Sequence, residues 1–117
     1  MKRRVVVTGV GLISSVGTGT EENWSAIKSG KSGIGPITQF DTTGFAARIA
    51  GEVKNFDPLA YVDKKDVKKM GRFIQFGMAA SEFAVKSANL KVPEDEAENF
   101  GVYIGSGIGG FEVIERE

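Results

Sequence analysis

A chain of 117 residues with 41% hydrophobic and 26% charged residues has the composition of an ordinary globular protein, and its 15 basic side chains balance 15 acidic ones. No apolar stretch approaches the ~20 residues that cross a bilayer, so a cytoplasmic protein without a membrane partner is expected. The absence of Cys and His excludes disulfides, thiolate or imidazole metal sites, a Cys nucleophile and a His general base within these residues.

The first predicted element is a buried strand over residues 4–8, which contains three successive valines and no proline. Gly9 and Gly11 follow directly and are expected to end the strand. A continuous apolar run of this length is typical of a strand that is covered on both faces.

A short amphipathic helix is predicted next. Its start is indicated by the capping-box spacing of Thr18 and Glu21, or by Thr20 as a single cap, and its end by Gly30. Residues 30–43 are dense in turn-forming residues and therefore predict a long surface loop.

The middle of the chain predicts one strand followed by two helices. The strand is expected near residues 47–53, and Asp63 can cap a helix that continues through several lysines. A longer helix is predicted from about residue 73 to residue 87, because phenylalanines recur there at helical spacing. We expect another backbone to approach this helix closely at its small residues, which are Gly77, Ala79, Ala84 and Ala88.

The last predicted strand, residues 101–104, runs directly into a glycine-rich loop, and a helix is predicted from Phe111. Gly105, Gly107 and Gly110 match the G-x-G-x-x-G pattern of dinucleotide-binding loops. That function also requires an acidic residue ~20 positions further on, and the sequence ends before that position. We therefore interpret the glycines as places of close backbone approach or positive φ, with dinucleotide binding as the alternative.

Four lysines, Lys64, Lys65, Lys68 and Lys69, have the spacing of two adjacent rungs on one helix face. Like charges at i, i+4 destabilise a helix by about 0.2–0.5 kcal/mol per pair, so the cluster is either a solvated face or a surface that meets an anionic partner. Nucleic acid is not indicated as that partner, because the lysines are not interleaved with aromatic residues and the chain has no net positive charge.

Five segments occur in this order along the chain: "RRVVVTGVGLISSVG", "W..I.SGKSGI..I..FD", "IAGEV..FDP", "KKDVKKMGRFIQFGMAA" and "GVYIGSGIGG". Taken together in this order and spacing, they resemble the opening part of the β-ketoacyl-acyl-carrier-protein synthases, and most closely their type II elongating branch. The resemblance covers essentially all of the chain.

The resemblance implies an α/β protein of the thiolase superfamily, in which two duplicated halves pack as α/β/α layers and the complete enzyme is a homodimer. Residues 1–117 would then be the early, incomplete part of the N-terminal domain, within the first half of the fold. In the family the catalytic Cys and two His lie beyond residue 117, so the chain alone is expected to have no catalytic residue and no activity. The resemblance implies neither a metal nor a cofactor.

Two roles known in the family correspond to residues that are present here. Lys64, Lys65, Lys68 and Lys69 match the basic helix that docks the acidic acyl carrier protein, which delivers acyl and malonyl groups on its phosphopantetheine arm. Ile108 matches the residue that borders the acyl pocket and limits its depth. A polyketide ketosynthase, its non-catalytic chain-length partner, and a carrier-binding module without catalysis remain alternatives.

Overall fold

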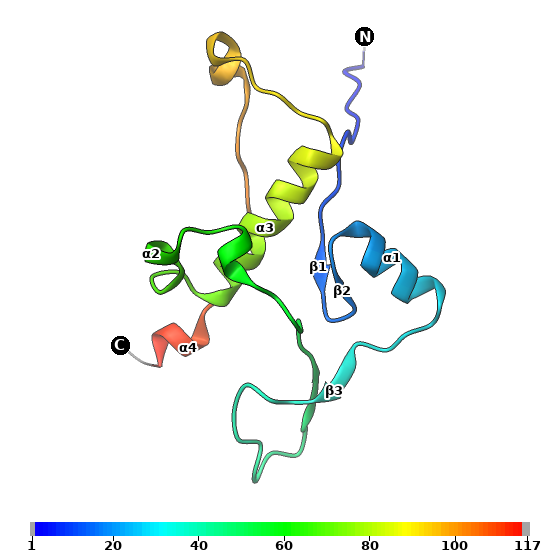
Figure 1. The fold of residues 1–117 in the computed structure, drawn as a ribbon, viewed down its shortest axis with the longest axis vertical. Helices are drawn as coiled ribbons and strands as arrows, with labels where there is room; N and C mark the ends of the chain where they lie inside the picture. The colour runs from blue at the N-terminus through cyan, green and yellow to red at the C-terminus, as the bar shows by residue number, and fades with distance from the viewer. Residues whose placement is uncertain (1, 116–117) are drawn as a thin grey trace. The chain divides into compact units, whose positions relative to one another are not determined.

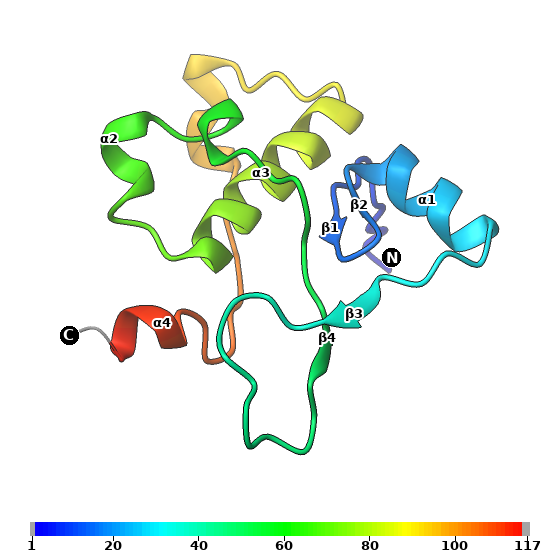
Figure 2. The same ribbon diagram turned by 60° about the horizontal axis from the view of Figure 1, so that its bottom comes forward.

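The computed structural model describes residues 2–115, which divide into two compact units. One unit is Leu12–Phe56, and the other combines the residues up to Gly11 with those from Asp57 onward. Figure 1 shows the order of the elements along the chain, and Figure 2 shows the same chain after a rotation. None of the helices within residues 2–115 combines the length and apolar character that crossing a bilayer requires.

The unit Leu12–Phe56 contains one helix and two small antiparallel sheets of two strands each. Ile13 pairs with Thr18 in the first sheet, and Ile34 pairs with Gly51 in the second. The elements are β1 (Ile13–Ser14), β2 (Gly17–Thr18), α1 (Thr20–Lys28), β3 (Ile34–Pro36) and β4 (Ile49–Gly51).

The start of α1 differs from the predicted capping box. Gly19 is the N-cap residue at φ 91° and no side chain caps the helix, which begins at Thr20 itself. Thr18 belongs to β2, and its backbone N–H donates a 2.9 Å hydrogen bond to Glu22 Oε2. The prediction of a Thr18–Glu21 box was therefore wrong, because the tight turn before the helix needs a positive φ that glycine adopts readily.

Asn23 holds α1 against the β1–β2 sheet. This side chain is only 1% exposed, and its Nδ2 donates hydrogen bonds of 2.8 Å to the Gly17 carbonyl and 2.7 Å to the Gly19 carbonyl. Its Oδ1 accepts a hydrogen bond from the Ser14 hydroxyl. These bonds satisfy a fully buried amide, which explains why a polar residue is tolerated there.

Gly30, at φ 68°, follows the end of α1 as predicted.

The β3–β4 pair corrects the predicted surface loop over residues 30–43, because β3 lies within it. The predicted strand at residues 47–53 is confirmed in the shorter form of β4. Beyond β3, the carboxylate of Glu52 accepts hydrogen bonds from the Thr38 N–H, the Thr38 hydroxyl and the Gln39 N–H. These bonds, led by the one from the Thr38 N–H, lower the pKa of Glu52 below its ordinary value.

The other unit is mainly helical. The long helix predicted at residues 73–87 is confirmed as α3, and the acidic connection after it forms a 3-10 turn. A short helix starts at Phe111 as predicted. The elements are η1 (Pro58–Ala60), α2 (Lys64–Val67), α3 (Arg72–Ser87), η2 (Glu94–Asn99) and α4 (Phe111–Ile114).

Two predicted strands, residues 4–8 and 101–104, are not strands in the structure. Their side chains are largely exposed, with 84% of Val7 and 89% of Val102 accessible to solvent. A strand forms only when a neighbour completes its ladder of hydrogen bonds, and no other segment within residues 2–115 pairs with either of these. Figure 1 shows that both segments run in the direction opposite to α3.

The predicted close approach to the long helix is confirmed at Gly9 and Gly11. A Cβ added at Gly9 would lie 2.6 Å from the Ala88 nitrogen, and one added at Gly11 would lie 2.6 Å from the Ala84 nitrogen. Both glycines therefore let the N-terminal segment lie directly on the backbone of α3, at a stretch of alanines.

Candidate functional site

The four predicted lysines lie on a short stretch of residues 64–69, here called the basic turn, which carries α2. All four are exposed. The predicted helix is shorter than expected: Lys64 and Lys65 belong to α2, Lys68 is its C-cap residue, and Lys69 lies in the turn that follows. Lys68 retains helical angles, φ −70° and ψ −19°, so the helical geometry continues as far as this residue.

The four ammonium groups differ in their carboxylate neighbours. Lys65 lies 3.8 Å from Asp63, and Lys69 lies 3.3 Å from Asp66. Lys64 and Lys68, which are four residues apart, have no carboxylate within 4.0 Å among the residues that the structure describes. Lys64 and Lys68 are therefore the two lysines of the basic turn whose positive charge is not offset by a close carboxylate.

The basic turn is attached to α3 by a buried side chain that the sequence analysis did not single out. Gln75 is 8% exposed, and its Nε2 donates hydrogen bonds of 3.2 Å to the Val67 carbonyl and 3.0 Å to the Met70 carbonyl. A signal was present, because Gln75 is a polar residue between Phe73 and Phe76, at the apolar start of the predicted helix.

Arg72, at the first position of α3, lies next to the lysines in sequence but contacts an aromatic ring. Its guanidinium carbon is 5.0 Å from the centroid of the Phe76 ring, the geometry of a cation–π contact. This contact places Arg72 along α3, so the basic turn is defined by the four lysines.

The C-terminal end of the glycine loop, which leads into α4, lies close to Phe73 at the start of α3. A Cβ added at Gly109 would lie 2.6 Å from the nearest atom of the Phe73 ring, and Gly110 has a left-handed φ of 75°. Gly105 and Gly107, in contrast, have open space where a Cβ would be. The predicted pocket residue Ile108 lies between these two pairs and is 79% exposed. Figures 1 and 2 both place α4 beside the start of α3.

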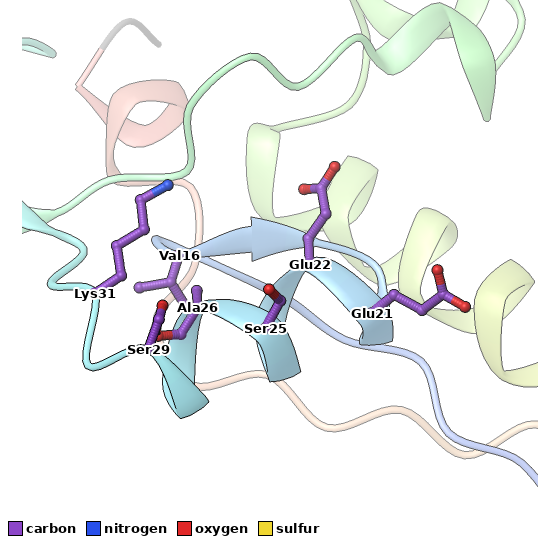
Figure 3. Close-up of a pocket in the computed structure, with 7 residues that line it drawn as sticks. All are labelled: Val16, Glu21, Glu22, Ser25, Ala26, Ser29 and Lys31. Atoms are coloured by element: carbon purple, nitrogen blue, oxygen red, sulfur yellow. The ribbon is translucent and has the colours of Figure 1, made fainter.

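A separate surface hollow of about 560 Å³ lies along α1 in the other unit. Figure 3 shows the Lys31 ammonium at one end of the hollow and the Glu21 carboxylate at the other. None of the predicted site residues lines this hollow, whose lining residues are Val16, Glu21, Glu22, Ser25, Ala26, Ser29 and Lys31. Within residues 2–115, no three acidic side chains come together in a group able to hold a metal ion.

Comparison with known proteins gives consistent matches over the chain. The family model of the β-ketoacyl synthase N-terminal domain matches residues 2–117. The 3-oxoacyl-(acyl-carrier-protein) synthase 2 of Vibrio cholerae is 54% identical over 97% of this chain, and that of Synechocystis is 46% identical over 99% of it. The chain spans 28% of the length of each of these relatives.

A solved structure, the ishigamide ketosynthase/chain length factor, is similar with a TM-score of 0.72 and 45% sequence identity. The similarity covers 82% of this chain and 23% of the solved one. At this identity the shared fold is thiolase-like, in agreement with the predicted α/β class. The family model and the relatives together show that this chain belongs to the β-ketoacyl synthase family.

Proposed function

We propose that the full-length protein is a type II 3-oxoacyl-acyl-carrier-protein synthase, which elongates carrier-bound acyl chains in fatty-acid biosynthesis. The observation that carries this proposal is the 54% identity, over 97% of this chain, to a synthase 2. This acyltransferase would condense an acyl group with a malonyl group and release carbon dioxide.

The proposed reaction divides its tasks between this chain and residues outside it. A cysteine thiolate attacks the acyl thioester and releases the carrier thiol, and two histidines then assist the decarboxylation that turns the malonyl group into the attacking carbanion. This chain contains neither residue type. Its proposed contribution is therefore substrate delivery by the basic turn and selection of the acyl chain by the glycine loop.

A condensation assay tests this function. The full-length protein is incubated with acyl carrier protein loaded with an acyl group and with malonyl carrier protein, and the products are identified by mass spectrometry. A carrier-bound 3-oxoacyl product two carbons longer than the acyl substrate is expected. Carrier binding without any product would instead indicate a carrier-binding module that lacks catalysis.

The proposed partner of the basic turn is the acidic acyl carrier protein. Two features support this choice: all four lysines are exposed, and Lys64 and Lys68 have no close carboxylate among the described residues. Exposed charges of one sign accelerate association with a partner of opposite charge and select against partners of like charge. The carrier would dock here while its arm carries the thioester toward the cysteine.

Ile108 is proposed as the residue that limits the depth of the acyl pocket. In the full-length protein, Ile108→Phe is expected to lower kcat/KM for the longest accepted acyl chains by about 10-fold and to leave shorter chains unaffected, because the larger side chain fills the end of the pocket. The unfolding midpoint is expected to change little, because the larger side chain would extend into an open substrate pocket and not into a packed core. An unaltered chain-length profile would remove Ile108 from the site.

The proposed fold of the whole protein is a pair of layered α/β/α halves in a homodimer, with residues 1–117 forming the early part of the N-terminal domain. The exposed apolar segments at residues 4–8 and 101–104 support this proposal, because both have the composition of buried strands. Neighbouring strands in the full-length protein would complete their hydrogen bonds. Those strands would also cover the exposed valines.

A polyketide ketosynthase or its non-catalytic chain-length partner is the second candidate function. It is favoured by the 45% identity to the ishigamide ketosynthase/chain length factor. The condensation assay separates the two roles of that class, since a chain-length partner lacks the nucleophilic cysteine and gives no product alone. A product extended by a single two-carbon step, without further rounds, would favour the synthase 2 function.

A further inference from the structure

Gln75 is the buried polar side chain through which α3 contacts the end of the basic turn. Its amide donates to the carbonyls of Val67 and Met70, at 3.2 Å and 3.0 Å. Val67 is the last residue of α2, and carbonyls at a helix end have no donor within the helix itself. The Gln75 amide therefore adds a donor at the Val67 carbonyl within the basic turn and another at the Met70 carbonyl directly after it.

The basic turn has few interactions of its own that would maintain its shape. A helix of four residues is far too short to be stable alone, and Asp63 at its N-cap makes no side-chain hydrogen bond to it. Lys64 and Lys68 repel one another at i, i+4 spacing. The following Met70 N–H···O=C Val67 bond is long, at 3.4 Å. The position of the turn therefore depends on contacts with other elements, which include η1 and the Gln75 side chain of α3.

We infer that Gln75 is a positioning residue for carrier docking, acting through Lys64 and Lys68 without touching the partner. The inference rests on the proposed function, because it takes the acidic acyl carrier protein as the partner. Holding a segment in its bound conformation reduces the ordering that binding would otherwise require. Removal of the Gln75 amide leaves the Met70 carbonyl without this donor and the Val67 carbonyl with only the long bond from the Met70 N–H, so the turn opens more often and presents its ammonium groups less often in the docking geometry.

The test compares two buried amides in the full-length protein. Gln75→Met replaces the amide by an apolar side chain of similar length. Asn23→Leu is the matched control, because Asn23 is also buried and also donates to two backbone carbonyls, but in the unit Leu12–Phe56. The probe is acyl carrier protein loaded with an acyl group. It is titrated at about 0.1 M salt, at which the Debye length is ~10 Å and exposed charges still interact.

Gln75→Met is expected to raise the Kd and the KM for the carrier by about 3- to 10-fold and to leave kcat unchanged. The reason is that the variant loses two hydrogen bonds that order the turn. Under native conditions, trypsin is expected to cleave this variant after the four lysines about 10-fold faster than the wild type, because cleavage requires local opening of the turn. Asn23→Leu is expected to lower overall stability without changing the Kd or the cleavage within the basic turn.

An unchanged Kd in Gln75→Met would overturn the inference, as would weaker binding without faster cleavage at the lysines. If that variant does not fold, Gln75→Asn replaces it, since an amide one methylene shorter cannot reach both carbonyls, and an unchanged Kd there has the same meaning. The proposed docking function is tested separately by Lys64→Glu with Lys68→Glu. If that pair leaves binding unchanged, docking at the basic turn is wrong whatever Gln75 does.

Discussion

Replacement of Gly11 by alanine is expected to destabilise the full-length protein by about 3 kcal/mol or to prevent its folding, because the added Cβ has no room. It would lie 2.6 Å from the Ala84 nitrogen and 2.8 Å from the Phe83 Cβ, and closer still to the Ala80 carbonyl oxygen. Two of these three neighbours are helix backbone atoms, which cannot move without breaking the hydrogen bonds of α3. Urea unfolding monitored by circular dichroism measures the effect.

Gly77→Ala is the matched control for this substitution. Gly77 lies inside α3, and a Cβ added there would meet nothing within 4 Å. Alanine is favoured over glycine within a helix by roughly 0.5–1 kcal/mol, so this variant is expected to unfold at slightly higher urea. If Gly11→Ala instead unfolded at the wild-type urea concentration, the N-terminal segment could not lie against α3 as described.

Lys64 and Lys68 are the two lysines of the basic turn without close carboxylates among the described residues. Reversal of their charge in the double variant Lys64→Glu with Lys68→Glu is expected to raise the KM for carrier-bound substrate by about 10-fold or more, with kcat nearly unchanged. The reason is that a patch which attracts an acidic partner becomes one that repels it. Stability should change little, because both side chains are exposed. Steady-state kinetics with acyl carrier protein as the varied substrate measures the effect.

The matched control is Lys65→Glu with Lys69→Glu, which changes the net charge by the same amount. Lys65 and Lys69 lie 3.8 Å and 3.3 Å from carboxylates, so part of their field is already compensated. This pair is therefore expected to raise the KM less. Equal effects of the two pairs would show that only total charge matters, and no effect of either pair would exclude the basic turn as the docking surface.

Features with a local cause could be predicted from the sequence. The helix at Arg72–Ser87 differs from the predicted range by one residue, because its pattern of phenylalanines and small residues extends over four turns. The exposure of the lysines follows from their charge. The interpretation of the loop glycines as places of close approach or positive φ is confirmed at Gly110, at φ 75° and close to Phe73, but it is wrong at Gly105 and Gly107, where a Cβ would meet nothing within 4 Å and φ is not positive.

Features that depend on distant partners could not be predicted. β3 has three residues and contains a proline, so only its pairing with β4 identifies it. The valine-rich segment at residues 4–8 has the composition of a strand, yet no described segment pairs with it. Gln75 appeared to be one polar residue in an apolar helix, because its partners, the Val67 and Met70 carbonyls, are backbone atoms whose position no side-chain pattern reveals.

The measurement that tests the central claim most directly is the salt dependence of carrier binding by the full-length protein. The Kd for acyl carrier protein is measured at 0.1 M and 1 M salt, between which the Debye length falls from ~10 Å to ~3 Å. Docking by the exposed ammonium groups of the basic turn predicts that the Kd is at least about 10-fold higher at high salt. An equal Kd at both concentrations would contradict this account.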